Sequence, residues 1–159
     1  MNKLALRDAI VAQLRAEFAL QTKAALLARD EAISEESRAE NKYDTHSQEA
    51  AYLAEGQARQ AAEIETSLAH YTSLALPTFS ASDRIALGAL VELSVRGKST
   101  WYFIGPRAGG MELHLSDLPV LVVTPSSPLG RQLVGQRVGD AVTVPGRGAA
   151  ATGTIVSVV

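Results

Sequence analysis

The sequence predicts an α+β protein, in which an N-terminal antiparallel helical hairpin (a coiled coil) precedes a small antiparallel β domain with one short helix. Three observations lead to this prediction. No proline or glycine occurs between Asn2 and Glu36, Pro77 marks the end of the helical region, and short apolar stretches separated by glycine-containing turns follow it.

The two parts also differ in charge. We expect the hairpin at 1–75, a linker at 76–83 and the globular domain at 84–159. Residues 1–75 hold eight basic and twelve acidic residues, whereas residues 76–159 hold seven and five. The molecule is therefore electrically polar, with its negative charge on the hairpin.

The first predicted helix runs from Asn2 to about Glu36. Its apolar residues recur at steps of three, four or seven, as one face of an amphipathic helix requires. They are Leu4, Val11, Leu14, Phe18, Ala25 and Ala28. This stripe needs a partner to cover it.

The second predicted helix supplies that partner. Its stripe consists of Ala50, Ala54, Ala61, Ile64, Leu68 and Tyr71. Thr45 with Gln48 fits a capping box, and Asp44 is a rival N-cap, so the helix begins near either residue and the chain reverses around Arg38 to Tyr43. Two such stripes predict antiparallel packing as a coiled coil.

An acidic cluster lies at the reversal, with its tip near residues 36–46. Its members are Asp30, Glu31, Glu35, Glu36, Glu40 and Asp44. Acidic residues near a helix N-terminus are also favoured by the helix dipole, so the residues alone leave open a solvated bend or a probe that carries carboxylates to a partner.

The β domain is predicted from short apolar stretches between turn residues. They are Ile85–Leu93, Thr100–Ile104, Leu118–Val123, Ala141–Val144 and Thr154–Val158. A short helix interrupts them, with Ser127 as N-cap, Pro128 at the first position, and Leu129, Leu133 and Val134 facing the sheet before Gly135.

Composition excludes several classes of protein. The absence of cysteine rules out disulfides, thiolate zinc sites and cysteine nucleophiles, and His46, His70 and His114 show no ligand spacing. The net charge of -2 disfavours a general nucleic-acid binder. No apolar run approaches the roughly 20 residues of a membrane span, so we expect a cytoplasmic protein without membrane contact.

Known enzyme motifs are also missing. The glycine-rich segments 105–110 and 146–148 do not fit a phosphate-binding loop and are typical of hairpin turns. No nucleophile elbow accompanies the serines. These observations disfavour a nucleotide-binding or hydrolytic enzyme.

One segment resembles a known family. Residues 126–144 read S-S-P-L-G-R-Q-L-V-G-Q-R-V-G-D-A-V-T-V, which is similar to the C-terminal signature of the bacterial Gre transcript cleavage factors. Residues 84–93 and 99–105 are similar to the first strands of that domain. The resemblance covers nearly all of residues 84–158.

The resemblance implies an FKBP-like globular domain and a partner, bacterial RNA polymerase. In such factors the globular domain docks at the rim of the secondary channel, and the coiled coil reaches the catalytic centre. Acidic tip residues there share Mg²⁺ with the polymerase and come close to the nascent RNA. It also implies an accessory factor that stimulates the polymerase's own RNA cleavage and is not itself an enzyme. Such a factor is a monomer with no cofactor bound in isolation.

The tip residues follow from the same resemblance. The family carries an Asp and a Glu three residues apart, and an ungapped count puts Glu40 and Tyr43 at those positions, with Asp44 one residue further on. Glu40 and Asp44 are the candidate catalytic and Mg²⁺-facing residues. Glu36, Lys42 and Tyr43 are candidate polymerase contacts, with Glu36 a reserve acid.

On the globular domain, Arg107, Arg131 and Arg137 are candidates for the polymerase rim, with ordinary solvation as the alternative. Three other functions stay open. The tip can enter the channel without supporting cleavage, since Tyr43 replaces a carboxylate. The FKBP-like fold suggests a prolyl isomerase, although few aromatic residues are available to line a proline pocket. The hairpin can also serve only for dimerisation.

Overall fold

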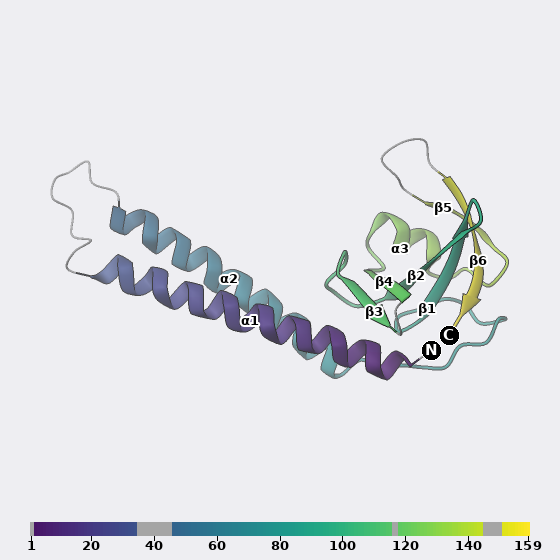
Figure 1. Cartoon of the computed structure of the whole chain (residues 1–159), viewed down its shortest axis with the longest axis horizontal. Helices are drawn as coiled ribbons and strands as arrows, with labels where there is room; N and C mark the ends of the chain where they lie inside the picture. The colour runs from purple at the N-terminus through teal and green to yellow at the C-terminus, as the bar shows by residue number, and fades with distance from the viewer. Residues whose placement is uncertain (1, 35–45, 116–117, 145–150) are drawn as a thin grey trace. The chain divides into compact units, whose positions relative to one another are not determined.

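The computed structural model describes residues 2–34, 46–115, 118–144 and 151–159. Two long helices come first, and a six-stranded sheet with one short helix follows (Figure 1). The predicted α+β class is therefore confirmed. None of the described helices combines the length and apolar character needed to cross a membrane.

The chain forms two compact units. One is the helical unit Val11–Ala69, and the other, the globular unit, joins Met1–Ile10 to His70–Val159. The base of each long helix therefore belongs to the globular unit. The boundaries expected from the sequence, at residues 75 and 83, stay predictions.

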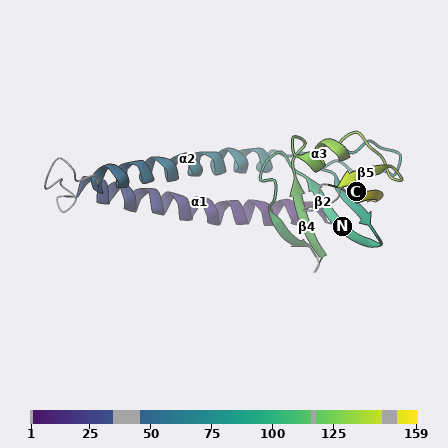
Figure 2. The same cartoon turned by 90° about the horizontal axis from the view of Figure 1, so that it is seen from above.

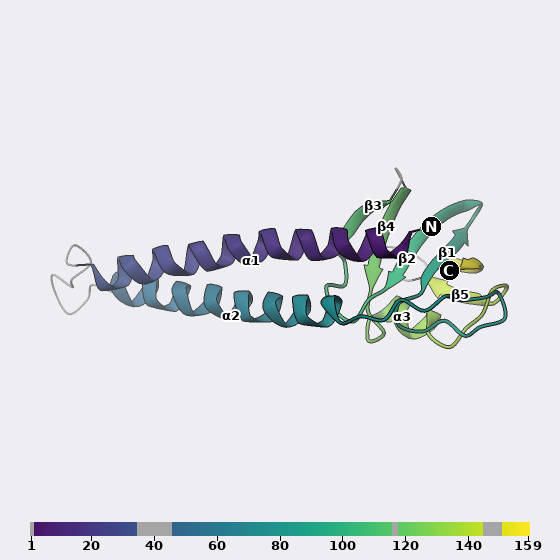
Figure 3. The ribbon, with the colours of Figure 1, turned by 90° about the horizontal axis from the view of Figure 1, so that it is seen from below.

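The two long helices are α1 (Lys3–Ile33) and α2 (His46–Thr72). Within the helical unit they run side by side in opposite directions (Figures 2 and 3). Asn2 caps α1, because its side-chain oxygen accepts a hydrogen bond from the Ala5 N–H at 3.1 Å. The predicted caps Asp44 and Thr45 lie outside the described residues.

The buried stripe of α1 differs from the predicted one at its start. Leu4 is 52% exposed, whereas Leu6 and Ile10 are fully buried and continue to Leu14. Positions 6, 10 and 14 follow one another at steps of four, and position 4 lies on another side of the helix. On α2 the predicted stripe is confirmed, since Ala61 and Tyr71 are buried and its other members are partly buried.

The globular unit contains a six-stranded sheet and one short helix. These elements are β1 (Leu90–Val95), β2 (Lys98–Ile104), β3 (Glu112–Leu115), β4 (Leu118–Val123), α3 (Pro128–Leu133), β5 (Ala141–Val144) and β6 (Ala151–Val158). The strand order is β3-β4-β2-β1-β6-β5.

The sheet is mostly antiparallel, as predicted, and it contains one parallel pair that the sequence did not predict. Strands β2 and β4 pair in parallel, with Trp101 opposite Val120, and the other four pairs are antiparallel. The cause is β3, a short edge strand missed in the sequence. It pairs antiparallel with β4 and so lets β4 return beside β2 in the same direction as β2.

The first predicted strand was too long at its start, because β1 begins at Leu90 and not at Ile85. Before it, Gly88 takes a positive φ of 82° and the Ala89 N–H bonds to the Ala86 carbonyl, which makes a turn. The turn from β1 to β2 consists of Arg96 and Gly97, both with positive φ, as a two-residue type I′ hairpin requires.

A β-bulge interrupts the alternation of β6. Ser157 pairs with Glu92 but Ile155 pairs with Leu93, so Val156 is an extra residue opposite β1. Ile155 and Val158, three positions apart, are therefore both buried, whereas Val156 is exposed. An uninterrupted strand would place these two residues on opposite faces.

Both faces of the sheet bury side chains. On one face Tyr102, Ile104, Val91 and Leu93 join the main core, which α3 covers through Leu133. On the other face lie Leu90, Phe103, Val120 and Val122, all buried. Tyr71 from the base of α2 reaches this second face, because Gly105 contacts both its hydroxyl and Val122.

Helix α3 starts as predicted, with Ser127 as N-cap and Pro128 first. Leu133 is fully buried and Leu129 packs partly on the core, as expected. Val134 is instead 39% exposed, because the chain has already left the helical conformation there, with φ -61° and ψ 130°. Gly135 then takes a positive φ of 86°.

Candidate functional site

The acidic tip lies outside the described residues. This holds for the candidate catalytic and Mg²⁺-facing residues Glu40 and Asp44, and for Glu36, Lys42 and Tyr43, whose roles stay predictions. Of the acidic cluster the structure describes Asp30 and Glu31, both exposed near the end of α1. Among the described residues, no group of three or more Asp, Glu or His side chains is placed to hold a metal ion.

The three candidate rim arginines lie on separate segments of the globular unit. Arg131 is on α3, Arg137 is in the α3–β5 connection, and Arg107 is in the β2–β3 loop, which we define as Gly105–Met111. All three are exposed. In the described part of the chain, no hydrogen bond or ion pair joins any two of them.

Two of these arginines take part in local contacts. The Arg131 guanidinium donates a hydrogen bond to the Ser126 carbonyl at 2.6 Å. The Arg137 backbone N–H donates to the Asp140 carboxylate at 2.8 Å. The pKa of Asp83 is lowered, first by hydrogen bonds from the Ser80 N–H and hydroxyl and to a smaller extent by the charge of Arg137. Part of the positive charge around α3 is therefore offset within the molecule.

Arg107 differs from Arg131, because its backbone carbonyl and not its guanidinium forms a hydrogen bond. The buried Tyr71 hydroxyl donates a hydrogen bond to the Arg107 carbonyl at 2.7 Å. Burial raises the pKa of Tyr71 well above its ordinary value, and the hydrogen bond opposes that rise only in part. Within the described residues, the Arg107 guanidinium itself contacts no charged or hydrogen-bonding group. The hydrogen bond from Tyr71 therefore holds the Arg107 backbone and leaves its side chain unpaired among the described residues.

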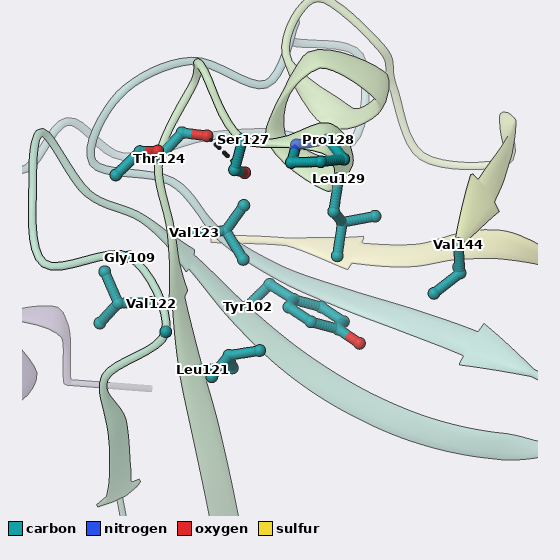
Figure 4. A pocket seen from close by; sticks show the side chains of 11 residues that line it. Tyr102, Gly109, Leu121, Val122, Val123, Thr124, Ser127, Pro128, Leu129 and Val144 are labelled. Carbon is teal, nitrogen blue, oxygen red and sulfur yellow. Dashed lines mark hydrogen bonds between the residues drawn. The ribbon is translucent and has the colours of Figure 1, made fainter. Parts of the chain in front are cut away.

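A second candidate site is the α3 cleft, a hollow of about 510 Å³ between α3 and the sheet. Figure 4 shows the Tyr102 ring among the side chains of Leu121, Leu129 and Val144. Burial raises the pKa of Tyr102, and a hydrogen bond with Thr100 opposes this. Sequence reasoning missed the cleft, because its walls come from five separate segments that no single motif joins.

Among the described residues that line the α3 cleft, Tyr102 is the one aromatic residue. The rest of the lining is aliphatic or small, and the expectation that few aromatic residues could line a proline pocket agrees with this. The cleft offers apolar surface and one phenol, with no acid or base among its described lining residues.

The motif at 126–144 has a structural role at the edge of this cleft. The Ser127 hydroxyl donates to the Thr124 carbonyl at 2.8 Å and accepts from the Gly130 N–H at 3.0 Å (Figure 4 draws the Thr124 contact). A β-carbon on Gly130 would lie 1.9 Å from the Thr124 carbonyl oxygen, so only glycine fits. The Asp140 carboxylate closes the following turn by accepting from the Arg137 N–H. The spacing of Ser127, Gly130 and Asp140 in this motif thus has a local folding reason.

Comparison with known proteins gave few matches. No protein-family model matches the chain. No curated protein matches it either. Among solved structures, it is similar to the GreA factor homolog 1 (Gfh1) protein of Thermus thermophilus, at 19% identity, with 96% of this chain and 93% of that chain covered and a TM-score of 0.39.

Two further structures show similar values. Gfh1 of Thermus aquaticus is 17% identical over 95% of this chain and 92% of its own, with a TM-score of 0.42. A structure described as the transcription factor Gfh1 is 21% identical over 96% and 92%, also with a TM-score of 0.42. At this identity and superposition, the likeness assigns neither a family nor an activity to the chain.

Proposed function

We propose that the chain is a Gre-like transcription elongation factor that binds bacterial RNA polymerase through its secondary channel and stimulates cleavage of backtracked RNA. The observation that carries the proposal is the segment 126–144, which resembles the C-terminal signature of the Gre factors. A long helical hairpin before this domain, with an acidic cluster between its helices, supports it further.

In this proposal the chain contributes carboxylates, and the polymerase contributes the reaction. Mg²⁺ prefers hard oxygen ligands, which Glu40 and Asp44 offer. In two-metal hydrolysis, the paired metal ions stabilise the attacking and leaving oxygens of a phosphodiester. The tip would help hold the second ion near the nascent RNA. The isolated chain is expected to carry no bound cofactor and to be a monomer. Sedimentation of the purified chain tests the oligomeric state.

The decisive experiment uses a backtracked polymerase complex with 3′-labelled RNA. The wild-type chain should accelerate release of short 3′ fragments, and Glu40→Gln and Asp44→Asn should each abolish the acceleration while leaving polymerase binding intact. Asp30→Asn is the matched control, because it removes an exposed acid from α1 outside the proposed pair. Failure to bind polymerase would overturn the proposal.

A second function is favoured by one residue. Tyr43 stands where the resemblance expects a carboxylate, which suits a regulator that occupies the secondary channel without supporting cleavage. A misplacement of about 1 Å at a reacting centre can cost on the order of 10²-fold in rate. Polymerase binding with no change in cleavage rate would select this function.

The docking surface can be tested separately. Arg107→Glu is the cleanest charge reversal, because the Arg131 guanidinium also bonds to Ser126 and Arg137 lies near Asp83. If the globular unit docks through Arg107, this variant binds polymerase more weakly at an unchanged thermal midpoint. Reversal of all three arginines should weaken binding further.

A further inference from the structure

The β2–β3 loop contains a backbone conformation that the local fold does not explain. In the described part of the chain, Arg96 and Ala108 are the two non-glycine residues with positive φ. Arg96 belongs to the type I′ turn between β1 and β2, where positive φ is required. Ala108, at φ 57°, lies in a longer loop where a glycine would avoid a cost of roughly 1 to 2 kcal/mol.

The hydrogen bonds of this loop show which way its peptide groups point. The Arg107 carbonyl points to the buried Tyr71 hydroxyl, and the Ala108 carbonyl accepts from the Met111 N–H at 3.2 Å. The peptide bonds of this loop are trans, as are those of the other described residues, so each N–H points opposite to the carbonyl of its own peptide group. The N–H groups of Ala108 and Gly109 are thus directed away from Tyr71 and from the turn.

These two N–H groups face the same side. For a residue with a β-carbon, positive φ permits only the left-handed helical region, in which successive N–H groups are nearly parallel. Neither N–H has a backbone or side-chain acceptor among the described residues. Paired N–H groups of this kind form a small concave site for an anion.

The loop is held in place before any ligand arrives. A β-carbon on Gly105 would lie 2.2 Å from the Tyr71 hydroxyl and 3.0 Å from Val122, so the chain passes closely over both. The Gly110 N–H also bonds to the Val122 carbonyl at 2.8 Å. Ordering the loop therefore adds little to the cost of binding.

The adjacent charge has the matching sign. The Arg107 guanidinium is exposed and forms no hydrogen bond or ion pair with a described residue. The Arg131 guanidinium, by contrast, donates a hydrogen bond to the Ser126 carbonyl. A guanidinium and two N–H groups together offer only donors, and a planar or tetrahedral oxyanion can accept from all of them. We propose that the Arg107–Gly109 segment binds a single oxyanion, either a phosphate or a carboxylate group. This inference stands independently of polymerase binding.

The test is a titration of the full chain followed by the backbone amide signals of Ala108 and Gly109 in NMR spectra. Sodium phosphate and sodium acetate are added at constant ionic strength, with sodium chloride as the reference. We expect saturating shifts of both amides with phosphate if the site takes phosphate groups, and with acetate if it takes carboxylates. Shifts no larger than those caused by chloride would overturn the proposal.

Variants test the two parts of the site. Arg107→Gln should weaken binding at least about tenfold, because it removes the charge-assisted donor. Lys98→Gln, which removes an exposed cation of the same unit, should leave the affinity unchanged. Tyr71→Phe removes the hydroxyl that orients the Arg107 carbonyl and should also weaken binding. Equal affinity of Arg107→Gln and wild type would show that the guanidinium has no part in the site, against the proposal.

Discussion

The Lys3 ammonium lies 4.9 Å from the centre of the Phe79 ring and also donates a hydrogen bond to the Pro77 carbonyl. The first turn of α1 is thereby joined to the segment that precedes the sheet. A further close contact is made there, since a β-carbon on Gly88 would lie 2.7 Å from the Ala75 carbonyl. Pro77 and Phe79, in the region expected to be a linker, therefore contact the first turn of α1 within the globular unit.

Lys3→Ala should lower the free energy of unfolding by about 1 kcal/mol, because it removes a cation–π contact and a hydrogen bond at a partly exposed site. The measurement is chemical denaturation of the full chain. Lys23→Ala, at an exposed position of the same helix, should change stability by less than about 0.5 kcal/mol. Equal effects of the two changes would contradict a specific role for Lys3.

Gly130→Ala should lower the free energy of unfolding by more than about 2 kcal/mol, because the new β-carbon meets the Thr124 carbonyl oxygen at 1.9 Å and α3 must move. Gly56→Ala is the opposite case. Beyond the neighbouring backbone of α2 itself, no atom of a described residue lies within 4 Å of a β-carbon there, so this change should raise stability by about 0.5 to 1 kcal/mol. Thermal unfolding measures both, and the two changes must differ in sign.

Tyr71 should make stability fall at alkaline pH. Its folded-state pKa is raised above the ordinary value of 10.0, so the folded state holds the proton while the unfolded state releases it. The stability that the neutral phenol contributes is fully present below pH 10 and is lost as the pH rises beyond it. Because Tyr71→Phe cannot titrate, the difference in unfolding free energy between wild type and this variant should shrink above pH 10. A difference that stays constant with pH would rule this out.

The helical unit should gain stability when its hollow is filled. A hollow of about 540 Å³ lies between α1 and α2, with Phe18 and Leu26 on one wall and alanines on the other. Ala58→Leu adds apolar surface to that wall and should raise the unfolding free energy by roughly 0.5 to 1 kcal/mol. Ala51→Leu, at an exposed position of α2 outside the lining, is the control and should have no such effect.

Periodicity and turn residues were sufficient to predict the two helices and α3, because their signals are local. The stripe of α1 was misplaced at Leu4, since Leu6 and Ile10 become buried through contacts within the globular unit that the helix alone does not reveal. The parallel pairing of β2 with β4 was also missed. It depends on β3, whose four residues carry only a brief alternation of polar and apolar side chains.

The candidate sites were harder to predict for a related reason. The orientation of the Arg107 carbonyl depends on Tyr71, which is 36 residues away in the chain. The α3 cleft likewise combines β2, β4, α3 and the end of β5. Residue spacing within one segment carries no signal for such arrangements, whereas it does carry the capping role of Ser127.

The position of β6 has a consequence for how the protein folds during translation. This strand follows all the others along the chain, yet it pairs with β1 on one side and β5 on the other. On the ribosome, β1 and β5 can complete their hydrogen bonding only after β6 has emerged, so the emerging chain carries two incomplete strand edges until then. Pairing of β6 with β1 and β5 should therefore be a late step in folding, one that joins β5 to the rest of the sheet.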